Sequence, residues 1–207
     1  DDLDEAGTAR GARIDGPIDW VTRYGKFGLT TGPDGTVGDQ AWKNITMSPS
    51  MTSTGQVIAD LYHQAGGPNV DGVFALDVYT LADLLTFTGP VDLPDGQGRL
   101  VPENAPAFLL NDQYDLTDKV ERVDLLETVS RVAIEELLSE TLPEPSKILD
   151  RLGPRAAQGR LAGYAVDPDE QTLFERIGLG GTLGPAATGD GLAVVFNNAG
   201  GNKIDFY

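Results

Sequence analysis

Apolar residues recur at helical spacing in the first strongly periodic segment of the chain, residues 53–65. One face of that segment collects its large apolar side chains, which are Val57, Ile58, Leu61 and Tyr62. Ser53, followed three residues later by Gln56, has the spacing of a helix capping box, and Gly66-Gly67 stops the pattern. We therefore expect an amphipathic helix here.

Residues 17–51 show no hydrophobic period of 2 or 3.6 residues and are expected to form an ordered loop region with aromatic anchors.

The next apolar run is short and lies between two aspartates. Gly72-Val-Phe-Ala-Leu76 follows Asp71 and precedes Asp77, which is typical of a buried strand. Asp77 is in position to cap a helix whose apolar face contains Leu81, Leu84 and Leu85. Thr88-Gly89-Pro90 ends that helix, and Val91 begins another strand. This strand–helix–strand unit predicts an α/β fold in which helices pack on a mixed central sheet.

The rest of the chain continues to alternate between helical and strand-like patterns. Helices are expected over residues 102–110, 117–141, 145–152 and 167–177. The helix over residues 117–141 is the longest, and Gly153-Pro154 is expected to end the helix over residues 145–152. Strands are expected over residues 160–166, 192–196 and 203–207, the last two as a hairpin. We expect a single α/β domain over residues 17–207, after a flexible segment over residues 1–16.

Composition and charge exclude several classes of function. The formal net charge is −17, so the clustered lysines and arginines that nucleic-acid or anionic-membrane binding requires are missing. The chain has no cysteine, which removes disulfides, thiolate zinc sites and thiol nucleophiles. His63 is the single histidine, which argues against a histidine metal site or a Ser–His–Asp triad.

The ends of the sequence indicate a trimmed portion of a longer protein. The chain begins with Asp1 instead of Met and ends in the strand-like residues 203–207. It contains no signal peptide and no apolar run of transmembrane length. We expect any membrane contact to depend on a segment outside this chain.

Several phrases in order along the chain resemble a bacterial family known as domain of unknown function 4012 (DUF4012). They are Trp42-Lys-Asn44 with Ser48-Pro49, Val70-Asp-Gly-Val-Phe-Ala-Leu-Asp77, Thr88-Gly-Pro-Val91, Glu103-Asn104 with Leu109-Leu110 and Tyr114, and Gly201-Asn-Lys-Ile-Asp-Phe-Tyr207. The chain departs from the family where Ser50-Met51 replace an acidic and an aromatic residue, and it lacks the family's upstream segment. The resemblance implies an extracytoplasmic domain of a membrane-anchored protein.

A fainter resemblance is to the LytR-CpsA-Psr proteins, which transfer glycopolymers from a polyprenyl-phosphate carrier to the cell wall. Residues 70–91 are similar to that family's strand, helix and Gly-Gly-Val turn, with Pro90 in place of the second glycine. Asp118-Lys-Val-Glu-Arg122 falls where the family has Asp-x-x-Arg, but Leu125-Leu126 stand where Arg-Gln would follow. The resemblance implies an α/β/α architecture, a polyprenyl-phosphate or glycan ligand and Mg²⁺ as a candidate cofactor.

Five residues are candidates for a ligand site, and each has a structural alternative. Asp77 ends a predicted strand, where ligands bind in open α/β sheets, and could contact a cation or a sugar hydroxyl, or serve only as a helix cap. Arg122 and Arg131 could pair with phosphate in a cleft, or lie on a solvated helix face with acidic partners. Lys203 and Asp205 are candidates through the family motif, although an Asn- and Gly-rich turn explains their surroundings.

The glycine-rich stretch over residues 178–184 is expected to be a turn-rich loop. It lacks the Gly-Lys-Ser/Thr ending of a phosphate-binding loop, and it follows a predicted helix instead of a strand. We therefore expect no nucleotide-binding role for it.

Two functional hypotheses follow from these observations. In the first, an extracytoplasmic cell-envelope domain handles a polyprenyl-phosphate-linked or glycopolymer ligand with a divalent cation, with Arg122 offsetting phosphate charge and Asp77 contacting the metal or a hydroxyl. In the second, the chain is a non-catalytic binding or scaffold domain of the envelope. Convergence of Arg122, Arg131 and an acidic residue in one pocket would favour the first hypothesis, and their dispersal would favour the second.

Overall fold

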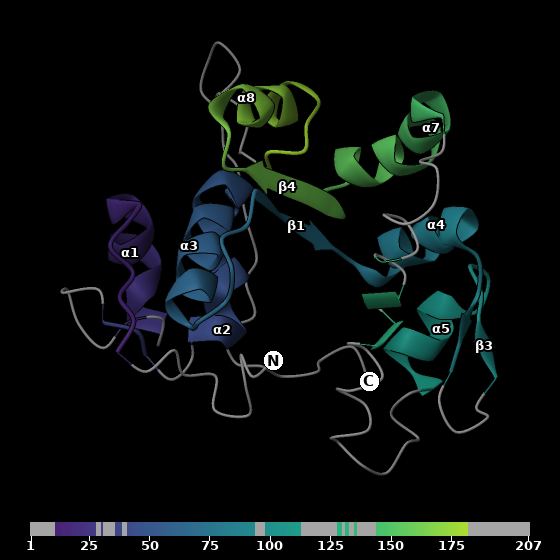
Figure 1. The fold of residues 1–207 in the computed structure, drawn as a ribbon, viewed down its shortest axis with the longest axis horizontal. Coiled ribbons are helices and arrows are strands. Elements are labelled where there is room, and N and C mark those ends of the chain that lie inside the picture. The colour runs from purple at the N-terminus through teal and green to yellow at the C-terminus, as the bar shows by residue number, and fades with distance from the viewer. Residues whose placement is uncertain are drawn as a thin grey trace, which may run out of the picture. The chain divides into compact units, whose positions relative to one another are not determined.

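A computed structural model of the chain describes residues 11–27, 30, 36–38, 41–93, 98–112, 128–129, 131–132, 135 and 144–181. The chain divides into two compact units. The first unit consists of Asp1–Phe74 and Ala162–Tyr207, and the inserted unit is Ala75–Leu161. Figure 1 shows the helices and strands of both units, most of them labelled.

The first unit contains helices in the region where the sequence predicted a loop. Its helices before residue 65 are α1 (Ile18–Tyr24), α2 (Ala41–Asn44) and α3 (Met51–Gln64), with 3₁₀ turns at Gly25–Phe27 and Ile45–Met47. The loop prediction for residues 17–51 was therefore wrong in part. At 7 and 4 residues, α1 and α2 are too short for a helical period to stand out from the sequence.

Helix α3 begins earlier than its sequence pattern suggested. Ser50 is the capping residue, and its hydroxyl accepts a hydrogen bond from the backbone N–H of Ser53 at 3.3 Å. Ser53, the predicted cap, lies inside the first turn. The earlier start places the buried Met51 in the helix, so burial of an apolar side chain decides between two serines that could both serve as caps.

The core of the first unit gathers residues from its N-terminal segments and α3. The buried side chains are Ala12, Ile14, Trp20, Ile45, Val57 and Leu61. Ala12 and Ile14, which belong to the segment expected to be flexible, are buried in this core. Residues 1–10 of that segment lie outside the described residues.

Strands β1 (Gly72–Leu76) and β4 (Leu161–Ala165) pair with each other. Val166 N–H donates to the Asp71 carbonyl at 2.8 Å, and Asp77 N–H donates to the Arg160 carbonyl at 3.1 Å. The start of β1 thus lies beside the end of β4, and the end of β1 lies beside the start of β4, so the two strands are antiparallel. The chain passes into the inserted unit within β1 and leaves it at β4.

Helix α8 (Pro168–Arg176) follows β4 and confirms the predicted start signal. The Asp167 side chain accepts hydrogen bonds from the backbone N–H groups of Asp169 and Glu170. Proline at the first helical position costs no hydrogen bond because that N–H has no partner within the helix. The predicted helix over residues 167–177 is therefore confirmed to within a residue at each end.

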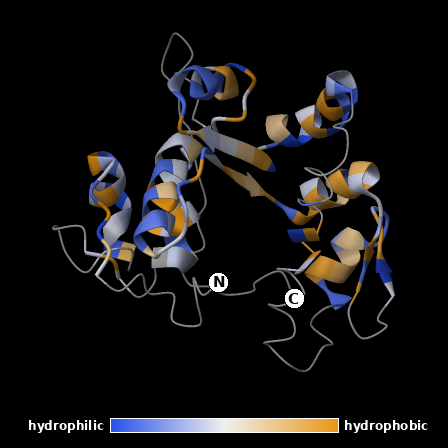
Figure 2. Cartoon of the chain, viewed as in Figure 1, coloured by the Kyte–Doolittle hydropathy of each residue, from blue (hydrophilic) through white to orange (hydrophobic). Residues whose placement is uncertain are grey.

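The inserted unit has its own hydrophobic core. Its elements are α4 (Val78–Thr88), β2 (Val91–Asp92), β3 (Arg99–Leu100), α5 (Ala105–Leu110) and α7 (Pro145–Ala157), and β2 pairs with β3 antiparallel. The core is formed by Leu81, Ala82, Leu85, Val91, Leu93, Leu100, Ala105, Leu109 and Val129. In Figure 2 hydrophobic residues, drawn in orange, recur along α4 and α5. Gly89, with φ 86°, ends α4 as its position before Pro90 predicted.

Helix α7 extends beyond the expected stop at Gly153-Pro154, and that prediction was wrong. The helix runs from Pro145 to Ala157 with Pro154 inside it. Proline removes one helical hydrogen bond, but Gln158 N–H still donates to the Pro154 carbonyl at 3.1 Å. The turn after the proline is also held by an ion pair between Arg155 and Asp83. Tertiary contacts therefore offset the local cost of the proline.

The α/β class is confirmed, with the described strands arranged as two small two-stranded sheets. Of the long helix predicted over residues 117–141, the described residues 128–129, 131–132 and 135 are helical, and Val129 is buried. The hairpin expected over residues 192–207 lies outside the described residues.

Candidate functional site

The candidate site begins at the N-terminus of α4, where Asp77 is held from two sides. Its Oδ1 accepts hydrogen bonds from the backbone N–H groups of Tyr79 at 3.1 Å and Thr80 at 2.9 Å, which caps the helix. Its Oδ2 accepts a hydrogen bond from Arg160 Nη1 at 2.5 Å. The Thr80 hydroxyl, fully buried, donates to the Arg160 carbonyl at 2.9 Å and so fixes the backbone that carries this arginine.

These contacts lower the pKa of Asp77. Partial burial alone would raise the pKa, but the hydrogen bond from the Thr80 N–H, the bond from Arg160 and the charge of Arg160 together lower it below its usual value of 3.8. A carboxylate with a lowered pKa is a weak base at neutral pH. Asp77 is therefore suited to hold a cation in place and poorly suited to accept a proton from a substrate.

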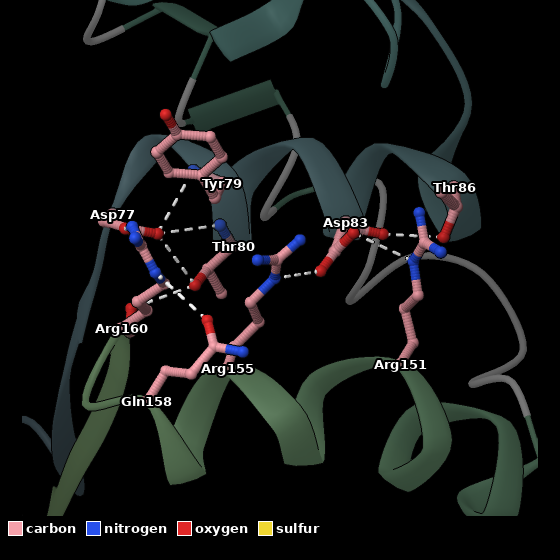
Figure 3. A network of polar contacts seen from close by, with 9 residues as sticks. All are labelled: Asp77, Tyr79, Thr80, Asp83, Thr86, Arg151, Arg155, Gln158 and Arg160. Atoms are coloured by element: carbon pink, nitrogen blue, oxygen red, sulfur yellow. Dashed lines mark hydrogen bonds and ion pairs between the residues drawn. The ribbon is translucent and has the colours of Figure 1, made fainter.

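Asp83, two turns further along α4, binds two arginines of α7. Its side chain is only 6% exposed. Oδ1 lies 2.9 Å from Arg151 Nε, and Oδ2 lies 2.5 Å from Arg155 Nε. Figure 3 shows the two guanidinium groups on either side of the carboxylate. The hydrogen bond to Asp83 raises the pKa of Arg155, with smaller contributions from the charges of Asp83 and Asp77. The Asp83 carboxylate therefore holds both guanidinium groups in position.

The ring of Tyr79 links the two ion-pair groups. The Cζ atom of Arg160 lies 4.6 Å from the ring centroid, and that of Arg155 lies 5.9 Å from it. Both distances are within the range of a cation–π interaction. Figure 3 shows the tyrosine beside Asp77, with the arginines on the α7 side. Arg151, Arg155 and Arg160 together with Tyr79 are called the arginine row below.

The structure describes two of the five residues predicted for a ligand site. Asp77 caps α4, as the structural alternative predicted, and it also forms an ion pair with Arg160. Its contact with a cation or a sugar hydroxyl stays a prediction. The Arg131 side chain is exposed on its helical segment, and its Nη1 is 3.2 Å from Glu135 Oε2, a pair with i,i+4 spacing. Arg122, Lys203 and Asp205 lie outside the described residues, so their roles stay predictions.

The sequence reasoning missed Asp83 and the arginine row. One signal was present: Asp83 is a charged residue among the apolar positions of α4, and such a residue is buried only with a partner. A second signal was the i,i+4 spacing of Arg151 and Arg155, which puts both on one face of α7. The partner identities needed tertiary structure, because Arg155 and Asp83 are 72 residues apart.

The described residues bear on metal binding and on membrane insertion. Histidine, aspartate and glutamate side chains do not gather there in groups of three that could hold a metal ion. Among the described helices, none is both long enough and apolar enough to cross a membrane.

Residues 29–114 match the model of a family described as a protein of unknown function, DUF4012. The match confirms the resemblance carried by the phrases between Trp42 and Tyr114. It does not extend to the phrase at residues 201–207. No curated protein and no solved structure matches the chain. The resemblance to the LytR-CpsA-Psr proteins therefore gains no support from these comparisons.

Proposed function

We propose that this DUF4012-like chain is an extracytoplasmic domain of the cell envelope that binds a polyprenyl-phosphate-linked or glycopolymer ligand without converting it. The proposal keeps the location and ligand class that the family resemblances imply. We favour binding over glycopolymer transfer because of one observation: arginines form ion pairs with the carboxylates of both Asp77 and Asp83.

The state of Asp77 and Asp83 supports binding over catalysis. Transfer of a glycopolymer needs a group that takes the proton of the incoming hydroxyl, and a carboxylate in that role must be reachable and sufficiently basic. Asp77 has a lowered pKa and is bound to Arg160. Asp83 is buried and accepts from two arginines. Both carboxylates therefore bind arginine side chains, and neither is placed to accept a proton from a substrate hydroxyl.

The test compares binding with turnover on the same sample. The folded chain is titrated by calorimetry with a polyprenyl pyrophosphate in detergent micelles, with and without Mg²⁺, and the ligand is then recovered and analysed by mass spectrometry after incubation with a glycan acceptor. We expect saturable binding and recovery of the ligand unchanged. Formation of a glycan–phosphate product would establish a transferase instead. Absence of binding by protein with a folded circular-dichroism spectrum would contradict the proposal.

A further inference from the structure

The arginine row is an unusual concentration of positive charge in this chain. The protein has 15 lysines and arginines against 32 aspartates and glutamates. Nevertheless, three arginines pair with the two aspartates Asp77 and Asp83, and two of these arginines also lie over the Tyr79 ring. The three guanidinium groups exceed the two carboxylates by one positive charge. In a chain with a net charge of −17, clustering three arginines does not improve solubility. The cluster therefore has another physical cause.

Asp83 alone does not explain the presence of two arginines. One guanidinium is enough to balance the charge of one buried carboxylate. Asp83 binds both Arg151 and Arg155, and it does so through the Nε atom of each. Each guanidinium carries five N–H donors, and Nε supplies one of them. The end of the group that bears Nη1 and Nη2 lies away from Nε, and this edge can bind an oxyanion through two parallel hydrogen bonds.

The row is both fixed and open to solvent. The side chains of Arg151, Arg155 and Arg160 are 49%, 27% and 39% exposed, so a solute can reach them. Asp83 and the Tyr79 ring hold Arg155, and Asp77 and the same ring hold Arg160. Ordering a long side chain costs about 0.5–1.5 kcal/mol on binding. Because these side chains are already ordered, most of that cost is avoided.

We propose that the arginine row binds a phosphate-type oxyanion through the Nη groups of Arg151 and Arg155, with Arg160 adding positive charge. The inference rests on the proposed binding function and names the part of the ligand that the protein recognises. A phosphate ester or pyrophosphate presents several oxygens in a tetrahedral arrangement and can bridge neighbouring guanidinium groups. A carboxylate has only two oxygens in one plane, so it should bind more weakly to the same row.

The experiment uses inorganic pyrophosphate as the probe and two arginine variants that remove the same charge. Arg151→Gln changes the row, whereas Arg131→Gln changes an arginine of similar exposure (55%) that pairs with Glu135 elsewhere. Binding is followed at low salt by NMR chemical shifts of ¹⁵N-labelled protein. We expect the dissociation constant to rise at least about tenfold in Arg151→Gln and by less than about twofold in Arg131→Gln, since tenfold corresponds to 1.4 kcal/mol.

The outcomes separate this inference from the proposed function. Equal weakening by both variants would mean that pyrophosphate senses only overall charge, and it would overturn the site. If a polyprenyl pyrophosphate binds the wild type but binds Arg151→Gln equally well, the binding function stands and the row is not its site. Acetate in place of pyrophosphate should bind measurably more weakly, and equal affinity would contradict the phosphate preference. The backbone NMR spectrum of Arg151→Gln reports whether the variant is folded.

Two sources of the oxyanion are distinguished by the same variants. A polyprenyl pyrophosphate in lipid vesicles presents the anion at a membrane surface, and a soluble glycerol-phosphate polymer presents repeated phosphodiesters. Vesicle binding that depends on Arg151 would assign the site to the lipid carrier. Polymer binding that depends on Arg151 would assign it to the glycopolymer. If neither depends on Arg151, while pyrophosphate does not bind at all, the row has no ligand of this class and the inference fails.

Discussion

Replacing Gly55 by alanine is predicted to destabilise the protein, although alanine is the better helix former. Gly55 lies in the interior of α3, where glycine-to-alanine replacement normally stabilises by about 1 kcal/mol. Here a Cβ atom would meet Tyr164 of β4 in the same unit. It would lie 2.6 Å from Cγ and 2.9 Å from Cδ1, and it would also overlap with the tyrosine Cβ. The tyrosine Cβ is bonded to the backbone, so a rotamer change cannot relieve the overlap.

The magnitude follows from these opposing contributions. Overpacking in a well-packed region costs about 1–3 kcal/mol, and contacts this short belong at or above the upper end of that range. After subtracting the gain of about 1 kcal/mol in helix propensity, a net loss of about 2 kcal/mol remains. For a chain of this size that loss lowers the melting temperature by about 4–8 °C.

Urea unfolding followed by circular dichroism measures the loss, and Gly153→Ala is the matched control. Gly153 is also inside a helix, but its added Cβ would meet only Leu149 Cδ1 at 3.6 Å, an ordinary contact. We expect that variant to lie between no change and about 1 kcal/mol of stabilisation, because a Cβ before Pro154 offsets part of the helix-propensity gain. If Gly55→Ala is as stable as the wild type, the close approach of α3 and β4 is wrong.

The remaining predictions concern Asp77, which caps α4, and Asp83, which lies within it. Asp83→Asn should lower the free energy of unfolding by about 2 kcal/mol. This loss is smaller than for a fully buried ion pair because Arg151 and Arg155 stay partly solvated. A loss under about 0.5 kcal/mol in urea unfolding would refute this prediction. Asp77 has a lowered pKa in the folded state, so its contribution is present above pH 3.8 and is lost as the pH falls through the folded pKa. The stability difference between wild type and Asp77→Asn should therefore be largest near neutral pH and disappear in strong acid, and a difference independent of pH would contradict the ion pair with Arg160.

The local elements of the fold were predictable where a polar residue marks the end of an apolar pattern. The strand at Gly72–Leu76 and the caps Asp77 and Asp167 were all predicted, because a short side chain that bonds to backbone N–H groups is a local signal. The end of α7 was not predictable in the same way. Helix α7 continues through Pro154, and the next residue, Arg155, contacts Asp83, which lies far away in the sequence.

The candidate site shows the same division between local and tertiary information. Asp77 was singled out because its place after a strand and before a helix can be read directly from the chain. Its pairing with Arg160 spans 83 residues, and no periodicity reveals which of many arginines will lie opposite. With 32 acidic residues in the chain, choosing the carboxylates that are bound by arginine requires distances. The sequence therefore indicated one end of the site and left the arginine row unseen.

The most direct test of the central claim is the NMR spectrum of the arginine side chains during a pyrophosphate titration. We predict that the Nε–H signals of Arg151 and Arg155 are protected from exchange before ligand is added, because both bind Asp83. We further predict that these two signals shift in a saturable way while that of Arg131 does not. Unprotected Nε–H signals from Arg151 and Arg155, or equal shifts at all three arginines, would contradict a preorganised oxyanion site on α7.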